Sequence, residues 1–190
     1  MERNVFVIMG RPASGKGTQA ALLAQKIPNA RIVSLGKEFR SLVAGETLVG
    51  KQLKVDLEAG KLSPSWLAEY TCEKVLFSIG ENDKVVFDSG CRIKREAELF
   101  DEICQWLGLP YVVVYIDVSE EEVTRRIIER KKIEGRADDA ESSIGKRISE
   151  FNTKTTLSID FFKSKNNLLI VNGEQPMDKV HQDVLKVLGL

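Results

Sequence analysis

Residues 10–18, with the sequence GRPASGKGT, place glycines, a lysine and a hydroxyl group in the spacing of a phosphate-binding loop. Glycines let the backbone curl so that several N–H groups point at phosphate oxygens. A helix that begins there adds unpaired N–H groups and the positive end of its dipole. We expect Lys16 to reach the β- and γ-phosphates and the Thr18 hydroxyl to help position Mg2+. The expected phosphate site consists of Ala13, Ser14, Gly15, Lys16, Gly17 and Thr18.

Short apolar runs alternate with helical patterns along the chain. The strands and helices that they predict must position this loop. Residues 5–9 (VFVIM) come directly before it and are typical of a buried parallel strand. Further strands are expected at residues 32–33 with their flanks, 85–87, 111–116 and 168–171, and helices at 19–27, 97–107 and 121–132. This alternation predicts an α/β fold with a five-stranded parallel sheet and helices on both faces.

Two segments interrupt the alternation. Residues 35–64 contain no convincing strand, and residues 131–143 are polar. In an α/β nucleotide enzyme such insertions are where mobile covers over the substrates are expected.

Composition indicates a single globular domain. The 190 residues include 28 basic and 28 acidic side chains, so no net charge favours a nucleic-acid or membrane-surface partner. The three cysteines form no C-x-x-C pair, which fits a reducing compartment. The first apolar run is too short for a signal peptide or membrane span, so we expect a cytoplasmic protein.

Gly17 follows Lys16 directly, where most phosphate-binding loops have Ser or Thr. The run GKGTQ at residues 15–19 resembles the adenylate kinase family. Four other places are similar to that family: SLGKEFR at 34–40 with GKQ at 50–52 and GKL at 60–62, DSGCR at 88–92, GRADD at 135–139 followed by Arg147, and GEQP at 173–176. The resemblance implies a P-loop NTP-binding fold with a core (1–34, 65–129 and 141–190), a helical acceptor lobe (35–64) and a short lid (130–140).

The resemblance also implies roles for individual residues. Arginine suits charge-dense phosphates because it stays charged and grips oxygens bidentately. The implied catalytic residues are Lys16, Arg92, Arg130, Arg136 and Arg147. Arg126, Arg130 and Gln175 would join the phosphate loop in binding ATP, with Arg126 stacked on its base. The AMP site would comprise Leu35, Arg40, Lys61, Leu62, Ser63, Ser89, Gly90, Cys91, Arg92, Glu96, Arg136 and Arg147.

Three acidic residues have implied roles beside these. Asp88 ends an expected strand and would hold Mg2+ through water; a turn or helix cap is the alternative. Asp138 and Asp139 would pair with basic groups when the lid closes, or cap a helix that begins near residue 142.

The acceptor side departs from the family pattern. Leu35 replaces a threonine that touches the base, Lys37 replaces an acidic residue, and residues 89–91 lack an aromatic–proline pair. Glu96 stands where a glutamine would grip the edge of adenine. Ionised glutamate only accepts hydrogen bonds, so it would complement guanine better. Acceptor specificity is therefore the open question of the sequence.

The predicted reaction is ATP + AMP = 2 ADP with Mg2+, catalysed by a monomer without nucleic-acid or membrane partners. No structural zinc is expected, because only five residues separate Arg130 from Arg136. One alternative is a kinase for another acceptor (GMP, UMP, CMP or a deoxynucleotide). The other is a catalytically weak nucleotide-binding regulatory module. We further expect Trp66 and Trp106 to pack in the core and His181 to lie at the surface.

Overall fold

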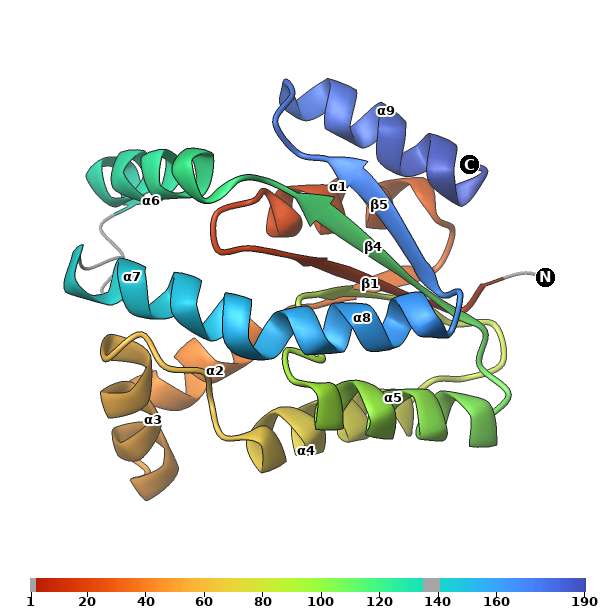
Figure 1. Cartoon of the computed structure of the whole chain (residues 1–190). Coiled ribbons are helices and arrows are strands. Elements are labelled where there is room, and N and C mark those ends of the chain that lie inside the picture. Colours follow the sequence, from red (N-terminus) through yellow and green to blue (C-terminus); the bar gives the residue numbers. More distant parts are fainter. Residues whose placement is uncertain (1–2, 135–140) are drawn as a thin grey trace.

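The computed structural model describes residues 3–134 and 141–190, and leaves out the side chains of 132–134, 141 and 142. Within these residues the strands β1 (Val5–Gly10), β2 (Ala30–Val33), β3 (Lys84–Asp88), β4 (Tyr111–Asp117) and β5 (Leu168–Asn172) form one parallel sheet. Their order is β2-β3-β1-β4-β5 (Figure 1). The predicted five-stranded parallel sheet is confirmed.

The middle of the sheet is apolar on both sides. In β1 every residue from Val5 to Met9 is buried, as is every residue of β4 from Tyr111 to Ile116. β-branched side chains dominate both strands and suit a pleated surface that is covered on both faces. These runs were recognisable in the sequence for that reason.

Helices cover both faces of the sheet, as predicted (Figure 1). The helices α1 (Lys16–Lys26), α6 (Glu120–Glu134) and α9 (Met177–Leu188) contribute apolar residues to one core, which includes Ile8 and Val114. The helices α4 (Ser65–Leu76), α5 (Lys94–Trp106) and α8 (Thr156–Ser164) contribute to the other, which includes Val7 and Val113. Alternate residues of each central strand therefore pack against different helices.

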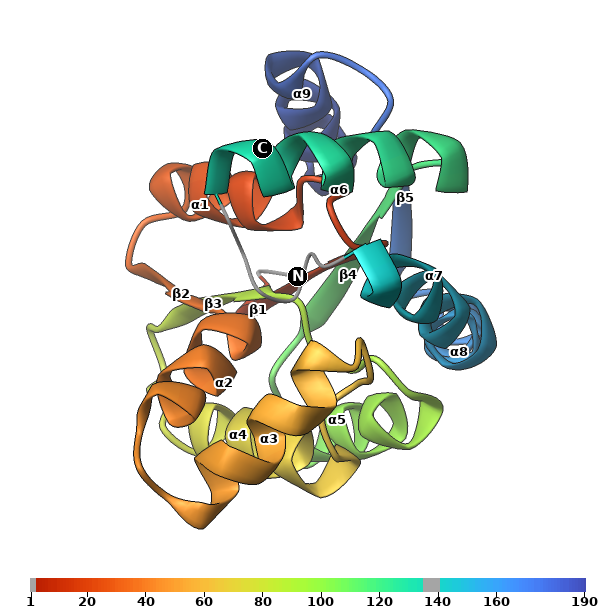
Figure 2. The ribbon, with the colours of Figure 1, turned by 90° about the vertical axis from the view of Figure 1, so that its left-hand side faces the viewer.

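The interruption at residues 35–64 is a pair of helices, α2 (Leu35–Ala44) and α3 (Leu48–Glu58), with no strand. Thr47 caps α3 by accepting a 3.0 Å hydrogen bond from the Gly50 amide. A β-carbon on Gly50 would collide with the Leu42 carbonyl, so glycine lets the two helices meet closely. Figure 2 shows this pair on the side of the molecule opposite α1 and α6.

A long helical segment begins at residue 141. It consists of α7 (Glu141–Glu150), a π-helical turn η2 (Phe151–Thr155) and α8, joined without a break. A π-helical turn is uncommon and often occurs at a functional site. Here its first and last residues, Phe151 and Thr155, both line the cleft described below.

Two of the packing predictions were wrong. Trp66 and Trp106 are 59% and 81% exposed. The buried stripe of α4 runs through Leu67 and Cys72, and that of α5 through Phe100 and Cys104, so both tryptophans lie off the stripes. Among the described residues, no helix is long and apolar enough to cross a membrane.

Candidate active site

A cleft of about 760 Å³ opens at the carboxyl edge of the sheet. Parallel pairing aligns Ile8 with Asp88 and Gly10 with Ile116, so β1 and β3 end at this edge together. Open α/β sheets bind ligands outside the carboxyl ends of their strands. The cleft is lined by the P-loop, by both helices of residues 35–64, and by residues of β3, α6, α7 and η2.

The P-loop leads from β1 into α1. Gly15 has φ 93° and stands as the N-terminal cap of α1, a conformation that glycine adopts without steric cost. A β-carbon on Gly10 would lie 2.5 Å from Ser14 Oγ and 2.7 Å from the Ile116 carbonyl oxygen. Both glycines are thus required by the backbone path, which brings the unpaired N–H groups of the first turn of α1 to the cleft.

Lys16 lies within this loop, and its Nζ donates a 2.6 Å hydrogen bond to the carbonyl oxygen of Arg11. Burial lowers the pKa of Lys16 to about 7, and the nearby Arg92 cation acts in the same direction. The Asp88 carboxylate opposes that shift. A bound polyphosphate would supply the negative charge that favours the protonated ammonium.

Asp88 ends β3 beside the start of α1. Its Oδ2 accepts a 2.9 Å hydrogen bond from Ser34 Oγ, which joins it to the residue before α2. A β-carbon on Gly17 would lie 3.2 Å from the same Oδ2. A larger residue at position 17 would therefore require this carboxylate to shift by a few tenths of an ångström.

The surroundings of Asp88 suit a Mg2+ ion held mainly by water and nucleotide phosphates. Asp88 and Thr18 both line the cleft and offer oxygen atoms, the donors that Mg2+ prefers. Within the described residues, no group of three or more His, Cys, Asp or Glu side chains is placed to hold a metal ion. The carboxylate and hydroxyl fit an ion that keeps several waters.

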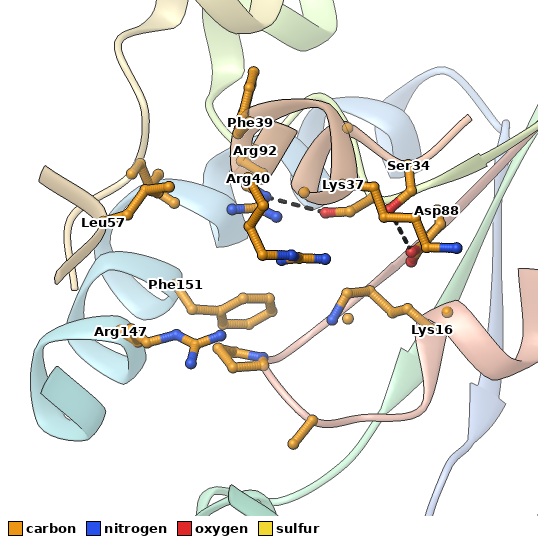
Figure 3. Close-up of a pocket in the computed structure, with 18 of the residues that line it drawn as sticks. Lys16, Ser34, Lys37, Phe39, Arg40, Leu57, Asp88, Arg92, Arg147 and Phe151 are labelled. Atoms are coloured by element: carbon orange, nitrogen blue, oxygen red, sulfur yellow. Dashed lines mark hydrogen bonds between the residues drawn. The ribbon is translucent and has the colours of Figure 1, made fainter. Parts of the chain in front are cut away.

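Basic side chains from separate elements meet across the cleft. Arg40 comes from α2, Arg92 from the segment after β3, Arg130 from α6 and Arg147 from α7, and all four line it. Figure 3 shows Lys16, Arg40, Arg92 and Arg147 around the same space. The Arg92 Nε donates a 3.0 Å hydrogen bond to Ser89 Oγ, and burial lowers the pKa of its guanidinium. Such a site attracts a strongly anionic ligand.

Arg126 connects α6 to the loop after β5. Its guanidinium donates hydrogen bonds to Glu122 Oε1 (2.7 Å) and to the Gly173 carbonyl oxygen (2.9 Å). A β-carbon on Gly173 would lie 2.5 Å from methyl carbons of Ile116 and Val118. The Gln175 amide instead donates hydrogen bonds to the Asn172 carbonyl oxygen and to Asp183 Oδ2, each at 3.0 Å. The Arg126 guanidinium, rather than the Gln175 amide, therefore lines the cleft.

Glu96 has partners other than a base. It is 7% exposed, and its Oε2 accepts hydrogen bonds from the backbone amides of Arg92 (2.6 Å) and Ile93 (3.4 Å). Burial raises the pKa of the carboxyl, while these hydrogen bonds oppose the shift. The carboxylate thus caps the start of α5.

The structure brings most of the predicted site residues together. Those that line the cleft are Ala13, Gly15, Lys16, Gly17, Thr18, Arg40, Lys61, Leu62, Asp88, Ser89, Gly90, Arg92, Arg126, Arg130 and Arg147. Those that do not are Ser14, Leu35, Ser63, Cys91, Glu96 and Gln175. Arg136, Asp138 and Asp139 lie outside the described residues.

The sequence did not predict the contacts that Arg11 and Phe151 make at the edge of the cleft. Arg11 Nη1 donates to the Val118 carbonyl (2.9 Å) and to the Tyr115 hydroxyl (3.2 Å). Its guanidinium carbon lies 4.9 Å from the centre of the Phe151 ring, within cation–π range. The only signal in the sequence was the spacing of Phe151, four residues after Arg147 and so on the same helical face.

The fold and the site define a P-loop nucleoside monophosphate kinase. A phosphate loop after the first strand and arginines from four other segments share one cleft. Comparison with known proteins makes the assignment specific: a family model described as adenylate kinase matches residues 8–167. The chain belongs to the adenylate kinase family.

Curated relatives match the chain along almost its whole length. An adenylate kinase of Synechococcus sp. is 35% identical over 185 residues, covering 96% of this chain and 95% of that protein. One of Thermus thermophilus is 31% identical, covering 97% and 96%. One of Bacteroides fragilis is 32% identical, covering 96% and 97%. These matches support the main hypothesis from the sequence and do not favour its two alternatives.

Proposed function

We propose that this protein catalyses reversible transfer of the γ-phosphoryl group from ATP to AMP, forming two molecules of ADP. One observation carries the proposal: Lys16, Arg40, Arg92, Arg130 and Arg147 line a single cleft although they come from different elements. Two nucleotides joined phosphate to phosphate concentrate negative charge, and these cations would neutralise it.

On the donor side, the P-loop amides and Lys16 would hold the ATP phosphates. The proposed place for the donor base is beside Arg126, whose guanidinium is fixed by Glu122 and by the Gly173 carbonyl. A planar guanidinium held in this way offers a flat face for stacking. Arg130 lies one helical turn further along α6, in reach of the phosphates.

On the acceptor side, Arg40 and Arg92 would hold the phosphate of AMP. Phe39, Val43 and Leu57 line the part of the cleft within the α2–α3 pair and offer apolar contact to the base. An AMP phosphate held there would face the P-loop, as in-line transfer requires. No covalent intermediate on the protein is needed, because positioning and charge stabilisation supply most of the catalysis.

Mg2+, when bound with ATP, would neutralise charge on the β- and γ-phosphates. Asp88 would hold it through water, and Thr18 would add a hydroxyl oxygen. Ser34 would keep the Asp88 carboxylate in place through its 2.9 Å hydrogen bond.

We also propose the domain roles that the sequence suggested. Residues 35–64 would close over the acceptor, and the lid at 130–140 would bring Arg136 to the phosphates, with Asp138 and Asp139 pairing with basic groups. Closure would exclude water and so prevent hydrolysis of ATP. The three free, buried cysteines support a cytoplasmic location, and the balanced charge supports a protein without nucleic-acid or membrane partners. The proposed monomer rests on the short lid.

The proposal is tested by counting products. Purified protein with MgATP and AMP should consume the two nucleotides in equal amounts and form two ADP for each AMP, as measured by chromatography. Formation of ADP and free phosphate without consumption of AMP would instead indicate an ATPase.

A further inference from the structure

One peptide bond beside the cleft is held by buried side chains at both of its polar atoms. It joins Cys91 to Arg92. Its carbonyl oxygen accepts a 2.5 Å hydrogen bond from Ser158 Oγ of α8, and its N–H donates a 2.6 Å hydrogen bond to Glu96 Oε2 of α5. Ser158 is 0% exposed and Glu96 is 7% exposed, so water competes little for either contact.

Two residues at or near this peptide have a left-handed backbone conformation, which is unfavourable for residues other than glycine. Ser89 has φ 69° and Cys91 has φ 52°, both in the left-handed region that costs an L-residue free energy. Such a conformation persists only where its surroundings fix it. The hydrogen bond donated by Ser158 and the one accepted by Glu96 act directly on this segment.

We propose that Glu96 and Ser158 are positioning residues that fix Arg92 for the acceptor phosphate, an inference that rests on the proposed function. Arg92 itself lines the cleft, whereas neither Glu96 nor Ser158 does. Rotation of the Cys91–Arg92 peptide would change the direction in which the Arg92 side chain leaves the backbone. The two hydrogen bonds oppose this rotation from opposite ends of the peptide.

These contacts favour a carboxylate over an amide at position 96. A carboxylate accepts from N–H groups more strongly than a neutral amide does, and Glu96 Oε2 serves the amides of both Arg92 and Ile93. Its charge also lies close enough to favour the charged form of Arg92. Glu96 then acts on the acceptor through Arg92, and base choice is left to other groups.

Ser158 extends the arrangement to the opposite wall of the cleft. It lies on α8, which continues η2 and α7 without a break, and α7 carries Arg147. The same helical segment therefore bears one cleft arginine and anchors the backbone of another. The relative position of Arg92 and Arg147 is set in part by this contact.

The test compares Ser158→Ala, Glu96→Ala and Glu96→Gln with two controls. Glu98→Gln changes an exposed carboxylate on α5, and Ser164→Ala removes an exposed hydroxyl at the end of α8. For each folded variant, three quantities are measured: KM for AMP, KM for MgATP, and the hydrogen-exchange rate of the Arg92 amide. AMP affinity is also measured directly by calorimetry, without turnover.

Ser158→Ala should raise KM for AMP about fivefold, the effect of one lost hydrogen bond. Glu96→Ala should raise it about tenfold and speed exchange at the Arg92 amide, because a charge-assisted bond is lost. KM for MgATP should stay within about twofold in both, and the controls should match the unmodified protein. Glu96→Gln keeps an acceptor oxygen, so it should rescue part of the loss without changing the preference for AMP over GMP.

Unchanged AMP affinity in folded Ser158→Ala and Glu96→Ala would overturn the inference. Equal losses for AMP and MgATP would do the same, because they would indicate general disruption. A changed preference for AMP over GMP in Glu96→Gln would also overturn it, because that result would indicate that Glu96 recognises the acceptor base. Failure of the proposed function would look different: the unmodified protein would transfer no phosphoryl group to AMP.

Discussion

Lys16 Nζ and the carbonyl oxygen of Arg11 are joined by a 2.6 Å hydrogen bond across the P-loop. The ammonium is thereby held inside the curve of the loop before any nucleotide binds. A cation fixed in advance needs little reorganisation when charge develops on a phosphoryl group. The position of Lys16 makes it the first residue whose removal should stop the reaction.

Lys16→Met should lower kcat by about 10²- to 10³-fold or more, since it removes a preorganised cation without adding bulk. Thermal unfolding should change little, because desolvation already opposes the charge of the partly buried ammonium. The matched control is Lys26→Met, which removes an exposed lysine at the end of the same helix. Near-normal turnover in the Lys16 variant would refute the proposed mechanism.

ATP binding should take up protons above neutral pH. The pKa of Lys16 is about 7 without ligand, and bound phosphates should raise it. Binding is thus fully favoured below pH 7 and weakens as the pH rises from 7 through the higher pKa of the complex. Calorimetry at pH 8 in buffers of different ionisation enthalpy should reveal the uptake, and Lys16→Met should abolish it. Equal heats in all buffers would contradict this assignment.

Asp88→Asn should raise the Mg2+ concentration needed for half-maximal rate by about tenfold or more, because a neutral amide holds metal-bound water less firmly. Binding of Mn2+ in the presence of ATP, followed by electron paramagnetic resonance, gives a readout independent of turnover. Asp178→Asn, an exposed change in the first turn of α9, is the control. An unchanged metal requirement would remove Asp88 from the proposed metal site.

Phe100→Ala should lower the free energy of unfolding by about 3–5 kcal/mol. The Phe100 ring is buried and makes edge contacts with Phe87, Tyr111 and Phe162 at centroid distances of 6.0, 5.2 and 6.4 Å. Trp106→Ala, on the same helix but 81% exposed, should cost no more than about 0.5 kcal/mol. Denaturant titration of both variants measures the contrast, and similar losses would contradict the described packing.

The strands and the P-loop were predictable because their signals are local. An apolar run such as residues 5–9 and the spacing of Gly10, Gly15 and Lys16 depend only on neighbours in sequence. The exposure of Trp106 was not predictable in this way. Its burial depends on which side of α5 meets the sheet, and that side is set by residues such as Phe100 and Cys104.

The unpredicted parts of the site depend on contacts between distant residues. Ser158 meets the Cys91 carbonyl across 67 positions of the chain, and nothing in the local sequence of either marks the contact. Likewise, family resemblance suggested a base-reading role for Glu96, but its oxygen meets the amides of Arg92 and Ile93. Local patterns therefore locate the phosphates better than they locate the acceptor.

The most direct test of the account is a phosphoryl-transfer assay with MgATP and, separately, AMP, GMP, CMP, UMP and dTMP. We predict rapid formation of two ADP per AMP, much slower transfer to the other acceptors, and little hydrolysis of ATP in their absence. Preferred transfer to another monophosphate would contradict the proposed acceptor. Tight binding of ATP with no transfer to any of the five would contradict the kinase itself.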